Sequence, residues 1–217
     1  NGGNATFNSF EAGFAALPPV TGIVMGAATM TTNVANAINV ANAVQMMPET
    51  MLVHLGTTAS YVNDGPIGEQ TPSGFFQTAY SMTKLLGEQY VKETVSPDRL
   101  LIIRPVFVYG GRHDHSSVLS TLVRRSLTKD RTPININMDL VKQKAFLHID
   151  DWTSAMVKLI DDSIVGEFVV GNPYEVYKYR VVLDVLAEQG IKPVNVTWEP
   201  DLDSLGNHVA DAQKLMK

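Results

Sequence analysis

The sequence predicts an α/β protein in which a doubly wound parallel sheet has helices on both faces. Three apolar segments, Val20–Ala28, Met51–Leu55 and Leu100–Ile103, carry this prediction. Each is a continuous apolar run, which is typical of a strand that is buried on both faces. A segment with helical spacing of apolar residues follows each run, so strands and helices alternate as they do around parallel sheets.

The other expected elements follow in chain order, with Pro and Gly marking many of their ends. A short helix over Phe10–Leu17 precedes the first strand and stops at Pro18-Pro19. We expect further helices over Thr31–Met47, Tyr80–Thr94, Ser117–Leu127, Asp150–Ile160 and Tyr179–Gln189, and further strands over Phe146–Ile149, Gly166–Val170 and Val194–Trp198.

The composition is that of an ordinary globular protein and excludes several classes of function. Hydrophobic residues make up 45% of the 217 residues and the net charge is -5, so nothing supports a nucleic-acid-binding surface. The absence of cysteine excludes disulfides and cysteine nucleophiles, and it agrees with a reducing, cytoplasmic location. No segment reaches the ~20 apolar residues of a membrane span, and we expect no metal site.

Tyr80 and Lys84 form the pattern that most clearly indicates chemistry. Four residues apart on an expected helix, they lie on one face with adjacent side chains. An ammonium within reach of a phenol stabilises the phenolate form, so such a pair can transfer a proton. The helix lies between the second and third strands, whose carboxyl ends meet at one edge of the sheet. Thr58, directly after the second strand, adds a hydroxyl at that edge.

The chain contains a second Tyr–Lys pair with the same spacing, Tyr174 and Lys178. Spacing alone therefore proves little, and the surroundings have to separate the two pairs. The second pair follows Asn172-Pro173, and no hydroxyl-rich strand end precedes it. We interpret this second pair as coincidental.

Four motifs in chain order are similar to those of the extended short-chain dehydrogenase/reductases. They are Thr57-Thr58-Ala59, Tyr80-x-x-x-Lys84, Arg104-Pro105-Val106-Phe107-Val108-Tyr109-Gly110 and Phe146-Leu147-His148-Ile149-Asp150-Asp151. The chain thus resembles the NAD-dependent epimerase/dehydratase group, which includes UDP-galactose 4-epimerase. The resemblance implies a partial Rossmann-like dinucleotide-binding domain over residues 1–110. It also implies a mixed segment over residues 111–217, with a small substrate lobe and a returning Rossmann strand and helix.

The resemblance also implies the roles of the catalytic residues and the cofactor. Tyr80 is the expected general acid/base on a substrate hydroxyl or carbonyl. Lys84 is expected to support Tyr80 and to hold the nicotinamide ribose. Thr58 replaces the usual Ser of the family as the hydrogen-bonding partner of the reacting oxygen. NAD or NADP is the implied cofactor, with hydride transfer to the nicotinamide.

Other positions match family residues that lie beside the cofactor. The strand end Gly26-Ala27-Ala28 has the small residues that let the cofactor approach the backbone. Asn33 matches a family Asn near the cofactor, and Val106 matches a residue beside the nicotinamide. These residues are the expected cofactor-binding residues, together with Tyr80 and Lys84.

Two departures from the family pattern concern the substrate. Phe107 replaces an Asn that contacts nucleotide sugars, and Lys144 replaces an Arg that pairs with the diphosphate. Phe107 cannot form a side-chain hydrogen bond, and Lys144 supplies a point charge instead of a bidentate clamp. With Thr58, they are the expected substrate-binding residues. The expected substrate is a nucleotide sugar or a smaller carbonyl compound, and a homodimer is one assembly that the resemblance allows.

The glycine-rich phosphate-binding turn of the family does not occur at the start of this sequence. By analogy with the family fold, the chain starts near the end of the third strand, so we expect an N-terminally truncated domain. The alternative is a cofactor-free relative that serves as a binding or structural subunit.

Overall fold

A computed structural model of the chain describes nine stretches of residues. They are 22–25, 32–61, 66–71, 78–110, 117–128, 132–136, 143–172, 176–198 and 209–211. The helix expected over Phe10–Leu17 lies outside these stretches.

The centre of the molecule is a four-stranded parallel sheet. Its strands are β1 (Gly22–Met25), β2 (Met51–Leu55), β4 (Leu100–Pro105) and β8 (Gly166–Val170), in the spatial order β1-β2-β4-β8. Every neighbouring pair is parallel, so all four carboxyl ends lie at one edge. The predicted α/β fold with a parallel sheet is therefore confirmed.

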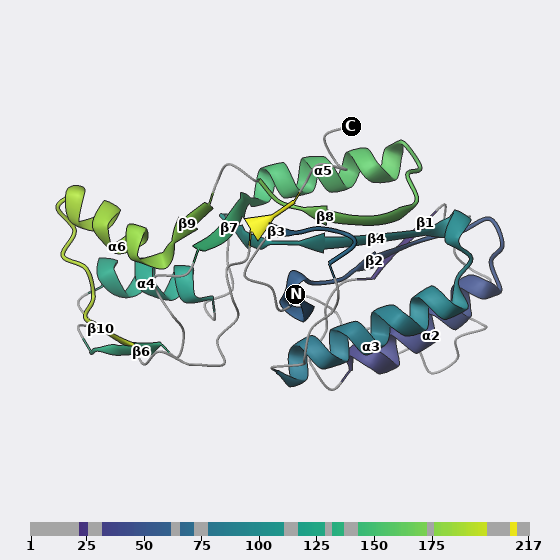
Figure 1. The fold of residues 1–217 in the computed structure, drawn as a ribbon, viewed down its shortest axis with the longest axis horizontal. Helices are drawn as coiled ribbons and strands as arrows, with labels where there is room; N and C mark the ends of the chain where they lie inside the picture. The colour runs from purple at the N-terminus through teal and green to yellow at the C-terminus, as the bar shows by residue number, and fades with distance from the viewer. Residues whose placement is uncertain are drawn as a thin grey trace.

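Helices cover both faces of this sheet (Figure 1). Helices α2 (Asn33–Gln45) and α3 (Ala79–Thr94) lie side by side on one face, and α5 (Ile149–Asp161) lies on the other. A separate hydrophobic core fills each interface. The strands are apolar on both faces for this reason, since each face is covered by a helical layer.

A glycine lets α2 and α3 approach each other closely. A Cβ built on Gly87 of α3 would lie 3.0 Å from the Cβ of Ala37 on α2. Near the start of both helices, the Asn33 amide donates a hydrogen bond of 3.3 Å to Thr83 Oγ1. The two helices therefore pack as one rigid layer beneath the sheet.

A smaller lobe lies beside the carboxyl edge of the sheet (Figure 1). Its core strands, β5 (Phe107–Tyr109), β7 (Gln143–His148) and β9 (Val176–Lys178), form a three-stranded sheet. Helices α4 (Val118–Leu127) and α6 (Tyr179–Glu188) pack beside it, together with the pair β6 (Ile134–Ile136) and β10 (Val196–Trp198). The remaining described elements are the strands β3 (Pro66–Ile67) and β11 (Val209–Ala210) and the 3-10 turns η1 (Thr58–Ser60) and η2 (Pro97–Arg99).

Helices and long strands lie where the sequence predicts them, whereas several short strands were missed. The predicted strand over Leu100–Ile103 extends to Pro105, and the strand predicted over Phe146–Ile149 instead spans Gln143–His148. The three-residue strands β5, β6 and β9 were not predicted. A strand of this length has no periodic pattern, and only its pairing with a distant strand defines it.

No helix in the described part of the chain is long and apolar enough to cross a bilayer. Within those same residues, no group of three or more His, Cys, Asp or Glu residues could hold a metal ion.

Arg99 ties the turn before β4 to the connection between α2 and β2. Its Nη1 donates to the carbonyl oxygens of Met47 at 2.8 Å, Thr50 at 3.2 Å and Val44 at 3.4 Å. Val44 is among the last residues of α2, and its carbonyl oxygen also accepts a hydrogen bond from the Met47 backbone at 3.0 Å. A cation at this end of a helix is also favoured by the helix dipole.

We expect Arg99→Ala to lower the free energy of unfolding by about 1–3 kcal/mol, because hydrogen bonds from a charged donor are lost. The matched control is Arg180→Ala, since Arg180 forms an exposed pair with Asp184 on α6. This control should change stability by less than about 0.5 kcal/mol. Urea unfolding followed by circular dichroism measures both values, and equal values would contradict the assigned role of Arg99.

Candidate active site

A reciprocal cap between Thr78 and Ser81, the residues on either side of Ala79–Tyr80, fixes the start of α3. Thr78 Oγ1 accepts a hydrogen bond from the Ser81 backbone at 3.1 Å, and Ser81 Oγ accepts one from the Thr78 backbone at 3.3 Å. Such a cap satisfies backbone donors that the first helical turn leaves open. Tyr80 therefore lies in an ordered first turn, where its side chain is half-buried.

Lys84 extends from α3 to the carboxyl end of β2. Its side chain is 5% exposed, and Nζ donates a hydrogen bond of 2.5 Å to the carbonyl oxygen of Leu55. Burial lowers the pKa of Lys84, and the negative charge of Glu88 partly opposes this effect. The ammonium is thus held at the sheet edge, one helical turn along from Tyr80.

Thr58 lies at the same edge, in the turn η1 that follows β2. Its hydroxyl is buried and donates a hydrogen bond of 3.2 Å to the carbonyl oxygen of Pro105, at the end of β4. The preceding residue, Thr57, caps the turn by accepting a hydrogen bond from the Ala59 backbone at 3.2 Å. Helix α3 contacts η1, so the structure brings Thr58 and the Tyr80–Lys84 helix together.

Among the other predicted cofactor residues, the structure describes Asn33 and Val106. Asn33 is buried at the start of α2, where its amide contacts Thr83 of α3. Val106 is buried after β4, and its backbone N–H donates a hydrogen bond of 3.0 Å to the Val170 carbonyl oxygen at the end of β8. Gly26, Ala27 and Ala28 lie outside the described residues.

The two predicted substrate residues that depart from the family pattern contact each other in the lobe. Lys144 is 2% exposed, and its Nζ lies 5.7 Å from the centroid of the Phe107 ring. This distance is within the range of a cation–π contact. In this conformation, the Lys144 charge is covered by protein instead of reaching the surface.

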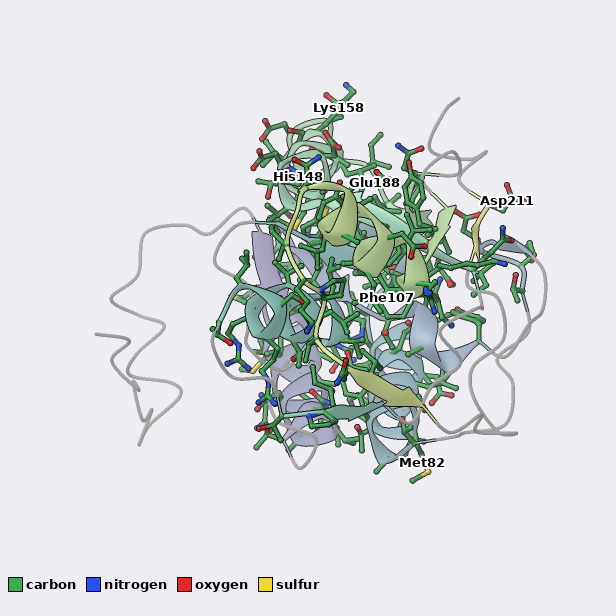
Figure 2. All side chains as sticks on the ribbon, turned by 90° about the vertical axis from the view of Figure 1, so that its left-hand side faces the viewer. Met82, Phe107, His148, Lys158, Glu188 and Asp211 are labelled. Carbon is green, nitrogen blue, oxygen red and sulfur yellow. The ribbon has the colours of Figure 1, made fainter. Side chains whose placement is uncertain are left out.

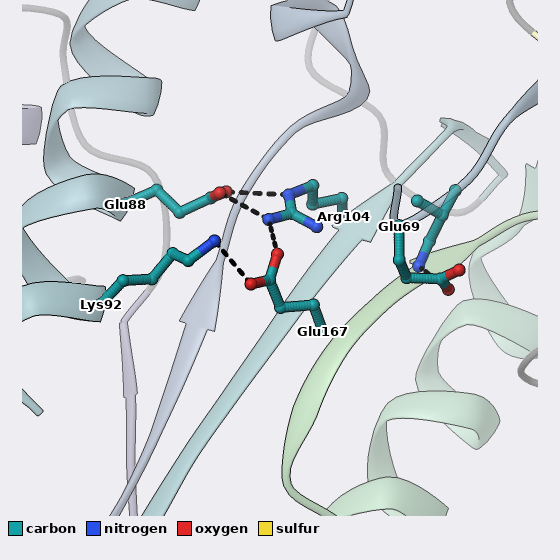
Figure 3. Close-up of polar contacts among 6 residues, drawn as sticks. Glu69, Glu88, Lys92, Arg104 and Glu167 are labelled. Carbon is teal, nitrogen blue, oxygen red and sulfur yellow. Dashed lines mark hydrogen bonds and ion pairs between the residues drawn. The ribbon is translucent and has the colours of Figure 1, made fainter. Parts of the chain in front are cut away.

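Behind the candidate site, a network of ion pairs fixes α3 to the sheet (Figure 3). Arg104 on β4 is 1% exposed, and its guanidinium donates two hydrogen bonds to Glu88 of α3, at 2.9 and 2.5 Å. The same guanidinium also contacts Glu167 of β8, which pairs with Lys92 of α3 at 2.6 Å. Burial alone would lower the pKa of Arg104, but its bonds to Glu88 more than offset this and raise it.

Gly56 has no room for a side chain because of this ion pair. A Cβ there would lie 2.7 Å from Glu88 Oε2 and 2.9 Å from Arg104 Cγ. Gly56 also donates a backbone hydrogen bond of 2.9 Å to the Ile103 carbonyl oxygen. The glycine that directly precedes the Thr57-Thr58 turn is therefore required by the close approach of the Glu88–Arg104 pair.

His54 on β2 is a buried titratable group that the candidate site does not use. It is 3% exposed, and neither ring nitrogen has a hydrogen-bond partner among the described residues. Burial lowers its pKa to about 3, and the positive charges of Lys84 and Arg104 act in the same direction. The imidazole is therefore neutral in the folded protein at neutral pH.

Sequence reasoning assigned no role to Glu88, Glu167, His54 or Gly56. Two signals in the sequence could have pointed to Glu88. Arg104 closes an apolar run that becomes a buried strand, so its charge needs an acidic partner. Glu88 lies four residues beyond Lys84, on the inward face of the same helix. Glu167 gave no signal, because its partners come from distant elements.

The comparisons with known proteins agree with this architecture. The sequence profile of the NAD dependent epimerase/dehydratase family matches residues 20–171. No protein with a curated description matches the chain.

Solved structures with a similar fold include three proteins in complex with NAD. The dTDP-glucose 4,6-dehydratase from Bacillus anthracis has a TM-score of 0.75 and 21% identity, over 90% of this chain and 65% of that chain. The UDP-glucuronic acid 4-epimerase from Bacillus cereus has a TM-score of 0.74 and 20% identity, over 91% of this chain and 67% of that chain. WbmG from Bordetella bronchiseptica has a TM-score of 0.70 and 25% identity, over 89% of this chain and 64% of that chain. The chain thus spans about two thirds of the length of these proteins.

We expect Glu88→Gln to lower the free energy of unfolding by about 3–5 kcal/mol, since it removes the more deeply buried of the two carboxylates that compensate the Arg104 guanidinium. Glu93→Gln on the same helix is the matched control, because Glu93 is exposed, and it should cost less than about 0.5 kcal/mol. Urea unfolding measures both. Similar stabilities of the two variants would show that the Glu88–Arg104 pair does not fix α3.

We expect His54 to make stability depend on pH between pH 6.5 and about 3. Its pKa falls from 6.5 to about 3 on folding, so the unfolded chain binds more protons in this range. The stabilisation is complete above pH 6.5 and is lost as the pH falls towards 3, by at most about 1.4 kcal/mol per pH unit. Unfolding free energies at pH 7.5, 6 and 5 should fall less steeply in His54→Leu than in the wild type. Parallel pH profiles would contradict the assignment.

Proposed function

The chain belongs to the NAD-dependent epimerase/dehydratase family, and from this premise we propose that it carries the proton-transfer site of such an enzyme. The expectation that the chain is a member of this family is confirmed. The proposed reaction is oxidation or reduction at a hydroxyl or carbonyl of a nucleotide sugar or a small carbonyl compound. The observation that carries the proposal is the position of Lys84, which is buried at the end of β2, the strand that precedes Thr58, and lies one helical turn from Tyr80.

The chemistry of these side chains suits proton transfer at a substrate oxygen. We assign Tyr80 as the group that takes a proton from a substrate hydroxyl or returns it to a carbonyl. Thr58 donates its hydroxyl proton to the Pro105 carbonyl, so its oxygen lone pairs remain available as acceptors for a substrate hydroxyl.

The residues at the sheet edge fit the nicotinamide end of NAD. A buried ammonium suits a ribose hydroxyl, and the buried apolar side chain of Val106 suits the face of a flat ring. We also propose that Asn33, at the start of α2, contacts the cofactor. When bound, NAD supplies the group that accepts and returns a hydride. NADP remains an alternative within this proposal, because no residue that would select between them has been identified.

The printed names of the similar structures support nucleotide sugars as the first substrates to test. These proteins are described as acting on dTDP-glucose and UDP-glucuronic acid. Phe107 and Lys144 remain our candidates for substrate contact, together with Thr58. Phe107 is the more accessible of the two, since it is half-buried whereas Lys144 is buried.

We also propose that the protein forms a homodimer through α3. Met82 and Leu86, one turn apart on α3, are 40% and 51% exposed. Figure 2 shows Met82 at the outer edge of the molecule. Exposed apolar side chains that share a helix face are typical of helix–helix interfaces between subunits.

We expect Tyr80→Phe, in the full-length protein that contains this chain, to reduce turnover by about 10²–10⁴-fold. The assay measures epimer formation and NADH absorbance with UDP-glucose, UDP-glucuronic acid and dTDP-glucose. The matched control is Tyr90→Phe on the same helix, because the Tyr90 hydroxyl contacts only the exposed Asn42 side chain among the described residues. This control should retain turnover within about twofold.

Unchanged turnover of Tyr80→Phe would overturn the catalytic assignment. A titration with NAD and NADP separates the proposal from its alternative, a cofactor-free binding or structural subunit. If the full-length protein binds neither nucleotide and converts none of the three substrates, the alternative is favoured.

A further inference from the structure

An apolar groove lies between α4 and α6 in the small lobe. Its volume is about 1160 Å³, which exceeds the ~300–1,000 Å³ of typical small-molecule pockets. Figure 2 views the molecule from the side of this lobe. Residues of β5, β7 and β9 contribute Tyr109, Phe146 and Tyr177 to its lining.

The groove leaves large apolar side chains in contact with water. On α6, Val181 is 37% and Val185 is 48% exposed, and Leu127 of α4 is 62% exposed. Val181 and Val185 are four residues apart, so both lie on the helix face that lines the groove. Apolar surface that is gathered in one concave place is typical of a binding site rather than of scattered surface residues.

The floor of the groove is preformed and aromatic. Phe146 is 6% exposed, and its ring centroid lies 6.2 Å from that of Tyr109 in an edge-on arrangement. Phe107 contacts the same ring, also at 6.2 Å. A ligand that enters the groove therefore meets a fixed apolar surface and does not have to order it.

One charged residue lines this groove among the residues that the structure describes. It is Arg124 of α4, which is exposed and whose guanidinium has no hydrogen bond or ion pair with a described residue. The hydroxyls of Ser120 and Thr128 also line the groove, but both take part in hydrogen bonds within the ends of α4. The described lining of the groove thus combines a long apolar surface with a single positive charge.

We propose that this groove binds an amphiphilic anion, with an alkyl or aryl body on the apolar wall and one anionic group on Arg124. Charge complementarity selects the anion, because a carboxylate or sulfate can accept a bidentate pair of hydrogen bonds from a guanidinium. A nucleotide diphosphate fits the groove less well. Its two phosphates would share one cation, and its sugar and base would meet valine and leucine side chains.

The test uses decanoate below its critical micelle concentration and the neutral 1-decanol, each titrated calorimetrically into the protein. Decanoate should bind the wild type. Arg124→Gln should weaken decanoate binding by at least about tenfold, which is roughly 1.4 kcal/mol, and should change decanol binding by less than about twofold.

Matched valine variants locate the binding site. Val185→Asp on α6 should abolish binding of both probes, because it places a carboxylate on the apolar wall. Val157→Asp on α5 is the control, since Val157 is 46% exposed and lies outside the groove. It should bind both probes like the wild type. Circular dichroism confirms that each variant is folded.

Several outcomes would overturn the proposal. Absence of decanoate binding, or equal binding by Val185→Asp and Val157→Asp, would exclude the groove as the site. Displacement of decanoate by UDP-glucose would assign the groove to a nucleotide instead. A change of oligomeric state in Val185→Asp, without decanoate binding by the wild type, would assign it to a second copy of the chain. Each readout is independent of turnover, so failure of the Tyr80 assignment leaves this test unaffected.

Discussion

The buried guanidinium of Arg104 is the constraint on which the rest of the structure depends. An unpaired charge in this position would be strongly destabilising, so α3 has to bring Glu88 against β4, and β8 has to bring Glu167. Two acidic partners from different elements then hold three parts of the fold together. Gly56 follows from the same pair, because the two side chains occupy the space that its Cβ would need. The turn that carries Thr58 begins directly after this glycine.

One face of α3 carries both the residues that fix the helix to the sheet and the proposed catalytic Lys84. Lys84, Glu88 and Lys92 recur every four residues and therefore share one side of the helix. They contact, in turn, the end of β2, the guanidinium on β4 and the carboxylate on β8. An ion network deep in the fold thus sets the depth at which Lys84 meets the sheet edge. In the proposed reaction, this arrangement fixes the ammonium before any substrate binds.

The small lobe differs from the central sheet, because aromatic packing takes the place of ion pairs there. Phe107 follows the sheet edge directly and covers the ammonium of Lys144. Phe146 joins Phe107 to Tyr109 and the apolar groove beyond. The two positions that depart from the family pattern are therefore in contact with each other, and Phe107 also contacts Phe146, which lines the groove.

The sequence by itself determined the α/β class and the long helices and strands, because these depend on local spacing and continuous apolar runs. From the same local spacing it predicted Tyr80 and Lys84 as a proton-transfer pair, and this remains a prediction. It also predicted Thr58 at the same edge, since parallel strands share their carboxyl ends. The positions of Asn33 and Val106 became visible only in the fold, and the predictions for Gly26–Ala28 remain predictions. Only the tertiary structure decided the short strands of the lobe, the ion network of Arg104 and the burial of the His54 imidazole. These features depend on residues that are far apart in the chain, and no local pattern records such distances.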